Sequence, residues 1–93
     1  MSENVLLSGT ITCTAVKIES FRAALVQHVK ASRAEPGCLD FEITPSPHDP
    51  LVFEVAERFV DRAAFEAHTT RTRASRWWRE TAGLARDLTV RHQ

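Results

Sequence analysis

Four segments of the chain alternate apolar and polar residues with a period of two, the pattern of strands that bury one face. The clearest runs from Val5 to Thr14, where apolar or small residues occupy the odd positions. The others span 38–44, 51–59 and 86–91. Because successive side chains of a strand point to opposite faces, the pattern predicts one sheet with a single apolar face.

Two segments with helical spacing separate these strands. The first, Glu19 to Ala34, should end at Glu35-Pro36-Gly37, because the residue before Pro avoids helical geometry and Gly permits a turn. The second begins after Asp61, a good N-cap, weakens at Thr69-Thr70 and resumes from Thr72 to Gly83. One stripe of the first helix is expected to face the sheet: Phe21, Ala24, Leu25, His28, Val29 and Ser32.

The order strand, helix, strand, strand, helix, strand predicts an α+β fold of the ferredoxin-like, split β-α-β type with a four-stranded antiparallel sheet. In that topology the first strand lies between the third and the fourth. A chain of 93 residues suits one domain, spanning 1–93. A domain of this size buries only about 60% of its unfolded surface, so association with a second subunit would stabilise it.

Charge and composition argue against several classes of partner. The 12 basic and 12 acidic residues cancel, which disfavours binding to nucleic acid. No run approaches the ~18 apolar residues of a membrane span, and no signal-like segment opens the chain, so we expect a cytoplasmic protein. Cys13 and Cys38 have no metal-ligand spacing, so no metal site is predicted.

Glu57 interrupts the apolar side of the third predicted strand, and we expect it to be the only ionisable side chain on the apolar face of the sheet. Burying it costs several kcal/mol unless a partner meets it, and His68 on the following helix is the candidate. A carboxylate bonded to one imidazole nitrogen leaves the other free to accept a proton, as a general base must. Alternatively, the two form a buried structural pair without turnover.

Aromatic side chains are candidates for a substrate pocket beside this pair. Those expected to line it are Trp77, Trp78, Phe41, Phe53, Phe65 and His28. The alternative is that at least one Trp belongs to the core and that His28 is a packed helix histidine. A basic run on the same segment would guide an anion or form a solvated or subunit-pairing face: Arg71, Arg73, Arg76 and Arg79.

Two linked stretches resemble the antibiotic biosynthesis monooxygenase family, particularly its quinol monooxygenase-like branch. The first is Ser32–Leu39, with the sequence SRAEPGCL. The second is Phe53-x-Val55-x-Glu57-x-Phe59-x-Asp61-x-x-Ala64-Phe65-x-x-His68. The resemblance extends from about Val5 to Arg91, nearly the whole chain.

The resemblance implies a dimeric α+β barrel, in which two chains associate through their sheets and each keeps a pocket between sheet and helices. Members with known activity oxidise quinols, anthrones or related electron-rich aromatics with O2 and use no flavin, haem or metal. For this sequence it implies a small aromatic substrate and O2 as partners and no cofactor. His68 would be the general base and Glu57 the residue that orients it.

Other functions fit the same residues. Isomerisation of a small carbonyl compound would need the same base without O2. A non-enzymatic dimeric ligand-binding or stress-response module would leave Glu57 and His68 purely structural. Haem-cleaving relatives use an Asn, a Trp and a His, whereas the only Asn here is Asn4, before the first strand, which argues against haem cleavage.

Overall fold

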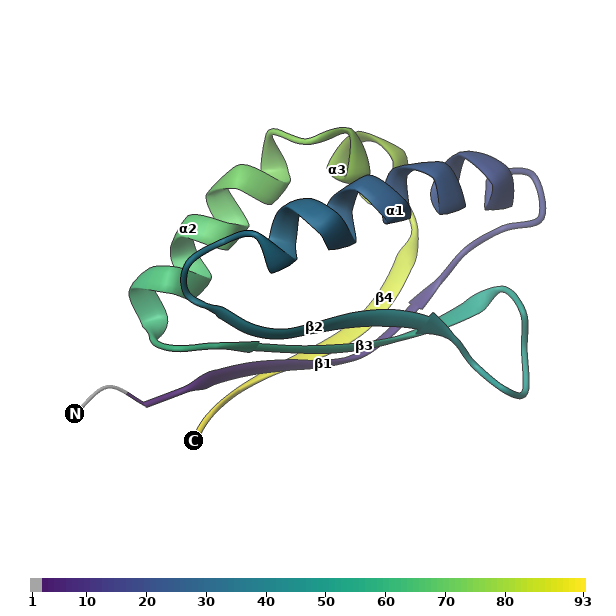
Figure 1. The fold of residues 1–93 in the computed structure, drawn as a ribbon. Helices are drawn as coiled ribbons and strands as arrows, with labels where there is room; N and C mark the ends of the chain where they lie inside the picture. Colours follow the sequence, from purple (N-terminus) through teal and green to yellow (C-terminus); the bar gives the residue numbers. More distant parts are fainter. Residues whose placement is uncertain (1–2) are drawn as a thin grey trace.

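The computed structural model describes residues 3–93, in which all three helices pack on one face of a four-stranded antiparallel sheet (Figure 1). The elements in chain order are β1 (Val5–Thr12), α1 (Ile18–Arg33), β2 (Cys38–Pro45), β3 (Val52–Phe59), α2 (Arg62–Arg73), α3 (Arg76–Thr81) and β4 (Ala85–His92). The strands follow the order β2-β3-β1-β4, so β1 lies between β3 and β4. The predicted α+β, ferredoxin-like fold is confirmed.

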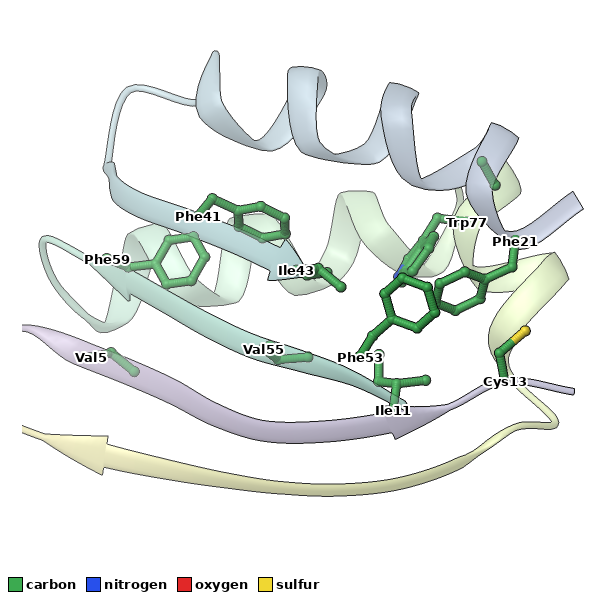
Figure 2. Packing of buried hydrophobic residues seen from close by; sticks show 11 residues of the cluster. Val5, Ile11, Cys13, Phe21, Phe41, Ile43, Phe53, Val55, Phe59 and Trp77 are labelled. Carbon is green, nitrogen blue, oxygen red and sulfur yellow. The ribbon is translucent and has the colours of Figure 1, made fainter. Parts of the chain in front are cut away.

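The core lies between the sheet and the helices, and the inward positions of the strands supply much of it. At one end the Phe21 ring packs against Phe53 and Trp77, with centroid separations of 4.5 and 5.0 Å (Figure 2). The buried hydrophobic residues are Val5, Ile11, Cys13, Phe21, Ala24, Phe41, Ile43, Phe53, Val55, Phe59 and Trp77. Every second residue of β3 from Phe53 is therefore buried, and Glu57 falls within this series.

The second helical region breaks later than the sequence predicts. Asp61 caps α2 as expected, since its side chain accepts a 2.8 Å hydrogen bond from the Ala64 N–H. The helix then continues through Thr69, whose hydroxyl donates to the Phe65 carbonyl one turn earlier. A new N-cap at Ser75 begins α3. Among residues 3–93 no helix is long and apolar enough to cross a lipid bilayer.

Two strand positions differ from the expected alternation. Leu39 is 45% exposed because the register shifts between Cys38 and Asp40, which turns its side chain away from the core. Arg86 pairs with Ile11 and shares the inward face of β4 with Leu88, although Glu57 was expected to be the only ionisable side chain there. The face that packs under the helices therefore carries a cation as well as a carboxyl group.

Gly9 allows the close approach of β1 and β4 at the centre of the sheet. Its φ is +144°, a conformation that side chains rarely adopt. A Cβ at this position would lie 1.9 Å from the Asp87 carbonyl oxygen. The β1–β4 pairing therefore depends on glycine here.

Candidate active site

His68 lies on the inward face of α2, and one of its ring nitrogens is held by a carboxylate. Its Nδ1 is 2.9 Å from Oε1 of Glu35, in the turn after α1. The other oxygen of Glu35 accepts a 2.5 Å hydrogen bond from Nε of Arg71. Since the carboxylate can only accept from the ring, Nδ1 carries the proton and Nε2 carries the lone pair, which the Thr72 hydroxyl meets at 3.3 Å.

Arg71 connects the Glu35–His68 pair to helix α1. A second nitrogen of its guanidinium donates a 2.9 Å hydrogen bond to the hydroxyl of Ser32, which is fully buried on α1. The chain of contacts therefore runs from Ser32 through Arg71 and Glu35 to His68. Two segments distant in sequence, 32–35 and 68–71, thus hold the imidazole in one orientation.

Glu57 approaches His68 from the opposite side of the ring. Its Oε1 is 3.5 Å from Nε2, and this oxygen forms no hydrogen bond within residues 3–93. The sequence correctly predicted the two side chains as neighbours. The expectation that Glu57 holds the ring is not met, because Glu35 already occupies Nδ1 and β3 presents Glu57 to Nε2.

Burial reverses the usual order of the two pKa values. Burial, with a smaller contribution from the charge of Glu35, raises the pKa of Glu57 to about 8. Burial also lowers the pKa of His68, although the Glu35 carboxylate opposes the shift. At pH 7 a neutral carboxylic acid therefore faces a neutral imidazole, so the site contains a proton donor and a proton acceptor.

A cavity of about 220 Å³ lies between the sheet and the helices, and both His68 and Glu57 line it. An apolar cavity of about 150 Å³ is enough to hold benzene, so this one is large enough for a substituted aromatic ring. Thr69 and Thr72 add hydroxyl groups to its wall. Its apolar lining comes from Leu7, Ile11, Ile43, Val55, Phe65 and Leu88.

Four of the six aromatic residues predicted for the pocket do line this cavity: Trp77, Trp78, Phe65 and His28. Phe41 and Phe53 do not, and this part of the prediction is wrong. They are 2% and 1% exposed, because Phe41 packs edge-on against His28 and Phe53 against Phe21. Their inward strand positions bury them in the core, where they support the rings that reach the cavity.

His28 is a second buried histidine beside the first. Its ring stacks on Trp77, with centroids 4.9 Å apart and planes within 3°. Burial, with smaller contributions from the nearby His68 and Arg71, lowers the pKa of His28 to about 3, so it is neutral at pH 7. Within residues 3–93 its Nδ1 has no hydrogen-bond partner, like Oε1 of Glu57. A ligand that meets these atoms would remove a cost of ~1–3 kcal/mol for each.

A larger and more open groove of about 580 Å³ lies beside the turn after α1. Glu35 and Arg71 reach it, but its lining does not include His68 or Glu57. We therefore assign the candidate active site to the smaller cavity, where the proton donor and acceptor face the same space. Within residues 3–93, no group of three His, Cys, Asp or Glu side chains is arranged to hold a metal ion.

Glu35 is the main site residue that the sequence did not predict. It lies in a turn, outside any periodic strand or helix, so its direction could not be deduced from a pattern. The one available signal is its position in the Ser32–Leu39 stretch, on which the family resemblance rests. The sequence motif therefore contained Glu35, but no role could be assigned to its carboxylate.

The arrangement of sheet, helices and cavity defines a small α+β protein with a cavity under its helices that His68 and Glu57 line. A sequence profile of the antibiotic biosynthesis monooxygenase family matches residues 5–80, and the chain belongs to this family. No curated protein matches the sequence.

Solved structures with the same fold include a protein from Shewanella oneidensis, with a TM-score of 0.80 and 23% identity over 100% of this chain and 93% of that one. Another, from Nitrosomonas europaea, is provisionally named an antibiotic biosynthesis monooxygenase; its TM-score is 0.79 and its identity 23%, over 100% and 92% of the two chains. A protein from Pseudomonas aeruginosa is 27% identical, with a TM-score of 0.70 over 100% and 93%. These likenesses support the fold assignment.

Proposed function

We propose that this protein is a cofactor-independent monooxygenase that oxidises a small quinol- or anthrone-like aromatic with O2. The proposal rests on the hydrogen bond, the lowered pKa and the position of His68. Its Nδ1 is bound to Glu35 at 2.9 Å, its pKa is lowered by burial, and the ring lines a cavity of about 220 Å³. Membership of the antibiotic biosynthesis monooxygenase family supports the same reaction class.

His68 acts as the general base. Its Nε2 has only long contacts, 3.3 Å to the Thr72 hydroxyl and 3.5 Å to Glu57, so a substrate hydroxyl can compete for it. Removal of the phenolic proton leaves an electron-rich anion in the cavity and an imidazolium next to the Glu35 carboxylate. That carboxylate stabilises the new positive charge, as a charge-assisted hydrogen bond does.

The substrate anion then reduces O2 directly. One quinol and one O2 yield one hydroxyquinone and one water, since the four-electron oxidation of the ring matches the four-electron reduction of O2. One oxygen atom enters the ring and the other leaves as water. The protein's part is to deprotonate the substrate, hold it and limit access of water.

Glu57 acts as a neutral acid in this scheme. Its pKa of about 8 keeps it protonated at pH 7, so it can donate a hydrogen bond to an oxyanion or a proton to reduced oxygen. The same residue in its ionised form would repel the substrate anion. We therefore expect activity to fall above about pH 8, where Glu57 loses its proton.

Oxygen consumption with a panel of quinols tests the proposal. We expect His68→Ala to reduce turnover by about 100-fold or more, the usual contribution of a positioned base. His48→Ala is the matched control, since His48 lies exposed in the loop between β2 and β3. Equal O2 uptake by wild type and His68→Ala would refute the proposed oxidation with His68 as the general base. No turnover by the wild type would favour the non-enzymatic ligand-binding module.

Isomerisation of a small carbonyl compound is the second candidate. The observation in its favour is that a neutral base and a neutral acid face one cavity, which is sufficient to move a proton from carbon to oxygen and back. Such a reaction consumes no O2. Substrate turnover that persists under nitrogen at the rate seen in air would favour it over oxidation.

We also propose that the chain forms a homodimer through the sheet face without helices. This face carries hydroxyl groups and charges of both signs, including an Arg58–Asp40 ion pair at 2.8 Å. Ala56 lies exposed near its centre, opposite Ser8 and Glu42. A mixed polar face of this kind suits a self-complementary partner.

A further inference from the structure

Two arginines of the cavity wall gather around one tryptophan. The Cζ atom of Arg86 is 5.2 Å from the centroid of the Trp78 ring, and that of Arg73 is 6.0 Å away. All three side chains line the cavity that contains His68 and Glu57. One part of the cavity wall therefore combines an aromatic surface with two positive charges.

The fold holds Arg86 in this place. It occupies an inward position of β4, opposite Ile11 of β1, and its guanidinium donates a hydrogen bond to the Thr81 carbonyl at the end of α3. Its side chain is half-buried, and a guanidinium remains charged at neutral pH. It is thus a fixed and partly desolvated cation, unlike a freely solvated surface arginine.

Neither cation has a protein counter-ion in the described part of the chain. The carboxylate–arginine pairs there are Arg58–Asp40 and Arg71–Glu35, and neither Arg73 nor Arg86 takes part in an ion pair. A partly desolvated guanidinium gains from an anion, and a carboxylate matches its geometry in a bidentate contact. The wall therefore favours a carboxylate brought by the ligand.

The register of the strands separates this anion-binding part from the proton-transfer groups. Glu57 pairs with Leu7 and Arg86 with Ile11, and four residues of β1 span ~13 Å at the backbone. Side chains from both positions reach the cavity. A ligand that uses both must therefore carry its hydroxyl and its anionic group at opposite ends.

We propose that the cavity selects aromatic substrates with a carboxylate at the end remote from the reacting hydroxyl, and that Arg86 and Arg73 bind this carboxylate. Trp78 packs against the body of the ligand. The inference rests on the proposed function for the reaction at His68, but binding of the carboxylate does not require turnover. By this proposal, Arg73 and Arg86 determine which substrates the cavity selects.

Isothermal titration calorimetry under nitrogen with three naphthalene probes tests the proposal, since binding is then measured without oxidation by O2. The probes are 6-hydroxy-2-naphthoate, with its groups at opposite ends; 3-hydroxy-2-naphthoate, with its groups adjacent; and 2-naphthol, with no carboxylate. We expect the first to bind wild type about tenfold more tightly than either of the others, since one charged hydrogen bond contributes on that order.

Variants then identify the groups responsible. Arg86→Gln should weaken binding of 6-hydroxy-2-naphthoate about tenfold and Arg73→Gln about threefold, because Arg73 is more exposed. Both should leave binding of 2-naphthol within about twofold. Arg79→Gln is the matched control, since Arg79 is exposed on α3 and does not line the cavity. Circular dichroism establishes that each variant folds.

Equal affinity of wild type for 6-hydroxy-2-naphthoate and 2-naphthol would overturn the proposal. An equal loss of affinity for 6-hydroxy-2-naphthoate and for 2-naphthol in Arg86→Gln would also overturn it. If Arg86→Gln does not fold, Arg73→Gln decides the matter alone, and its failure to affect the carboxylate probe would refute the proposal. Carboxylate-selective binding of these probes, together with no O2 uptake by the wild type across the quinol panel, would instead retain this inference and refute the proposed oxidation.

Discussion

The replacement of Glu57 by Gln should remove a pH dependence of stability that the wild type possesses. The pKa of Glu57 is raised from 4.5 to about 8 in the folded protein, chiefly by burial. Below pH 4.5 the carboxyl is protonated in both folded and unfolded chains and carries no penalty. Between the two values only the unfolded chain ionises, so the free energy of unfolding falls as the pH rises.

The size of this effect follows from the two pKa values. Each pKa unit corresponds to ~1.4 kcal/mol, and the slope applies over most of the interval between 4.5 and about 8. Integrated from pH 5 to pH 8, the loss amounts to about 3 to 4 kcal/mol, a large share of the ~5–15 kcal/mol typical of a domain. Gln cannot ionise, so Glu57→Gln should gain stability relative to wild type by about this amount over the same range.

Urea denaturation at pH 5, 6, 7 and 8, followed by tryptophan fluorescence at constant protein concentration, measures the difference directly. Comparison of the two proteins at each pH cancels the titration of the groups that do not interact with Glu57. Glu66→Gln is the control, because Glu66 is exposed on α2. Its difference from wild type should stay within about 0.5 kcal/mol across the range.

A difference between wild type and Glu57→Gln that does not change with pH would refute this reasoning. It would mean that Glu57 is ionised in the folded protein at pH 5. The role of Glu57 as a neutral acid would then be lost, and a protonated His68 would have to compensate the buried charge.

Three further predictions concern other parts of the molecule. Glu35→Gln should lower kcat by roughly 10- to 100-fold and move the acidic limb of the kcat/KM pH profile to lower pH, because Glu35 raises the pKa of His68; an unchanged profile would contradict this. Gly9→Ala should cost about 2–5 kcal/mol in urea denaturation, whereas Gly83→Ala, which meets nothing within 4 Å, should stay within about 0.5 kcal/mol. Light scattering should give twice the 10.5 kDa chain mass at micromolar concentration. Ala56→Glu should lower this mass, whereas Ala23→Glu, at an exposed position, should not. A mass of 10.5 kDa for wild type would refute the dimer.

The strand pattern of the sequence was sufficient to predict the fold and to single out Glu57. Alternation with a period of two determines which face of a strand is buried, so one carboxyl among apolar inward positions is visible without a structure. The Asp61 cap was equally visible, because capping depends on neighbouring residues alone. Local patterns therefore identified the pair Glu57 and His68.

Contacts between distant segments could not be read from local patterns. Glu35 meets His68 only because the turn after α1 lies beside α2 in the folded chain, and no periodicity describes a turn. The phase of β4 turns Arg86 inward, although Glu57 was expected to be the only ionisable side chain on that face. The contact of Arg86 with Trp78 depends on how α3 packs over that strand. The later helix break likewise reflects the Ser75 cap, which competes with the Thr69-Thr70 signal.

Incubation under oxygen-18 gas tests the central claim most directly, namely that His68 prepares a bound aromatic anion for oxygenation by O2. With a quinol that the wild type oxidises, mass spectrometry should find one labelled oxygen atom in the hydroxyquinone, and the second label should appear in water. His68→Ala should form this product at least about 100-fold more slowly. A product without label, or the same product formed at the same rate under nitrogen, would contradict the account.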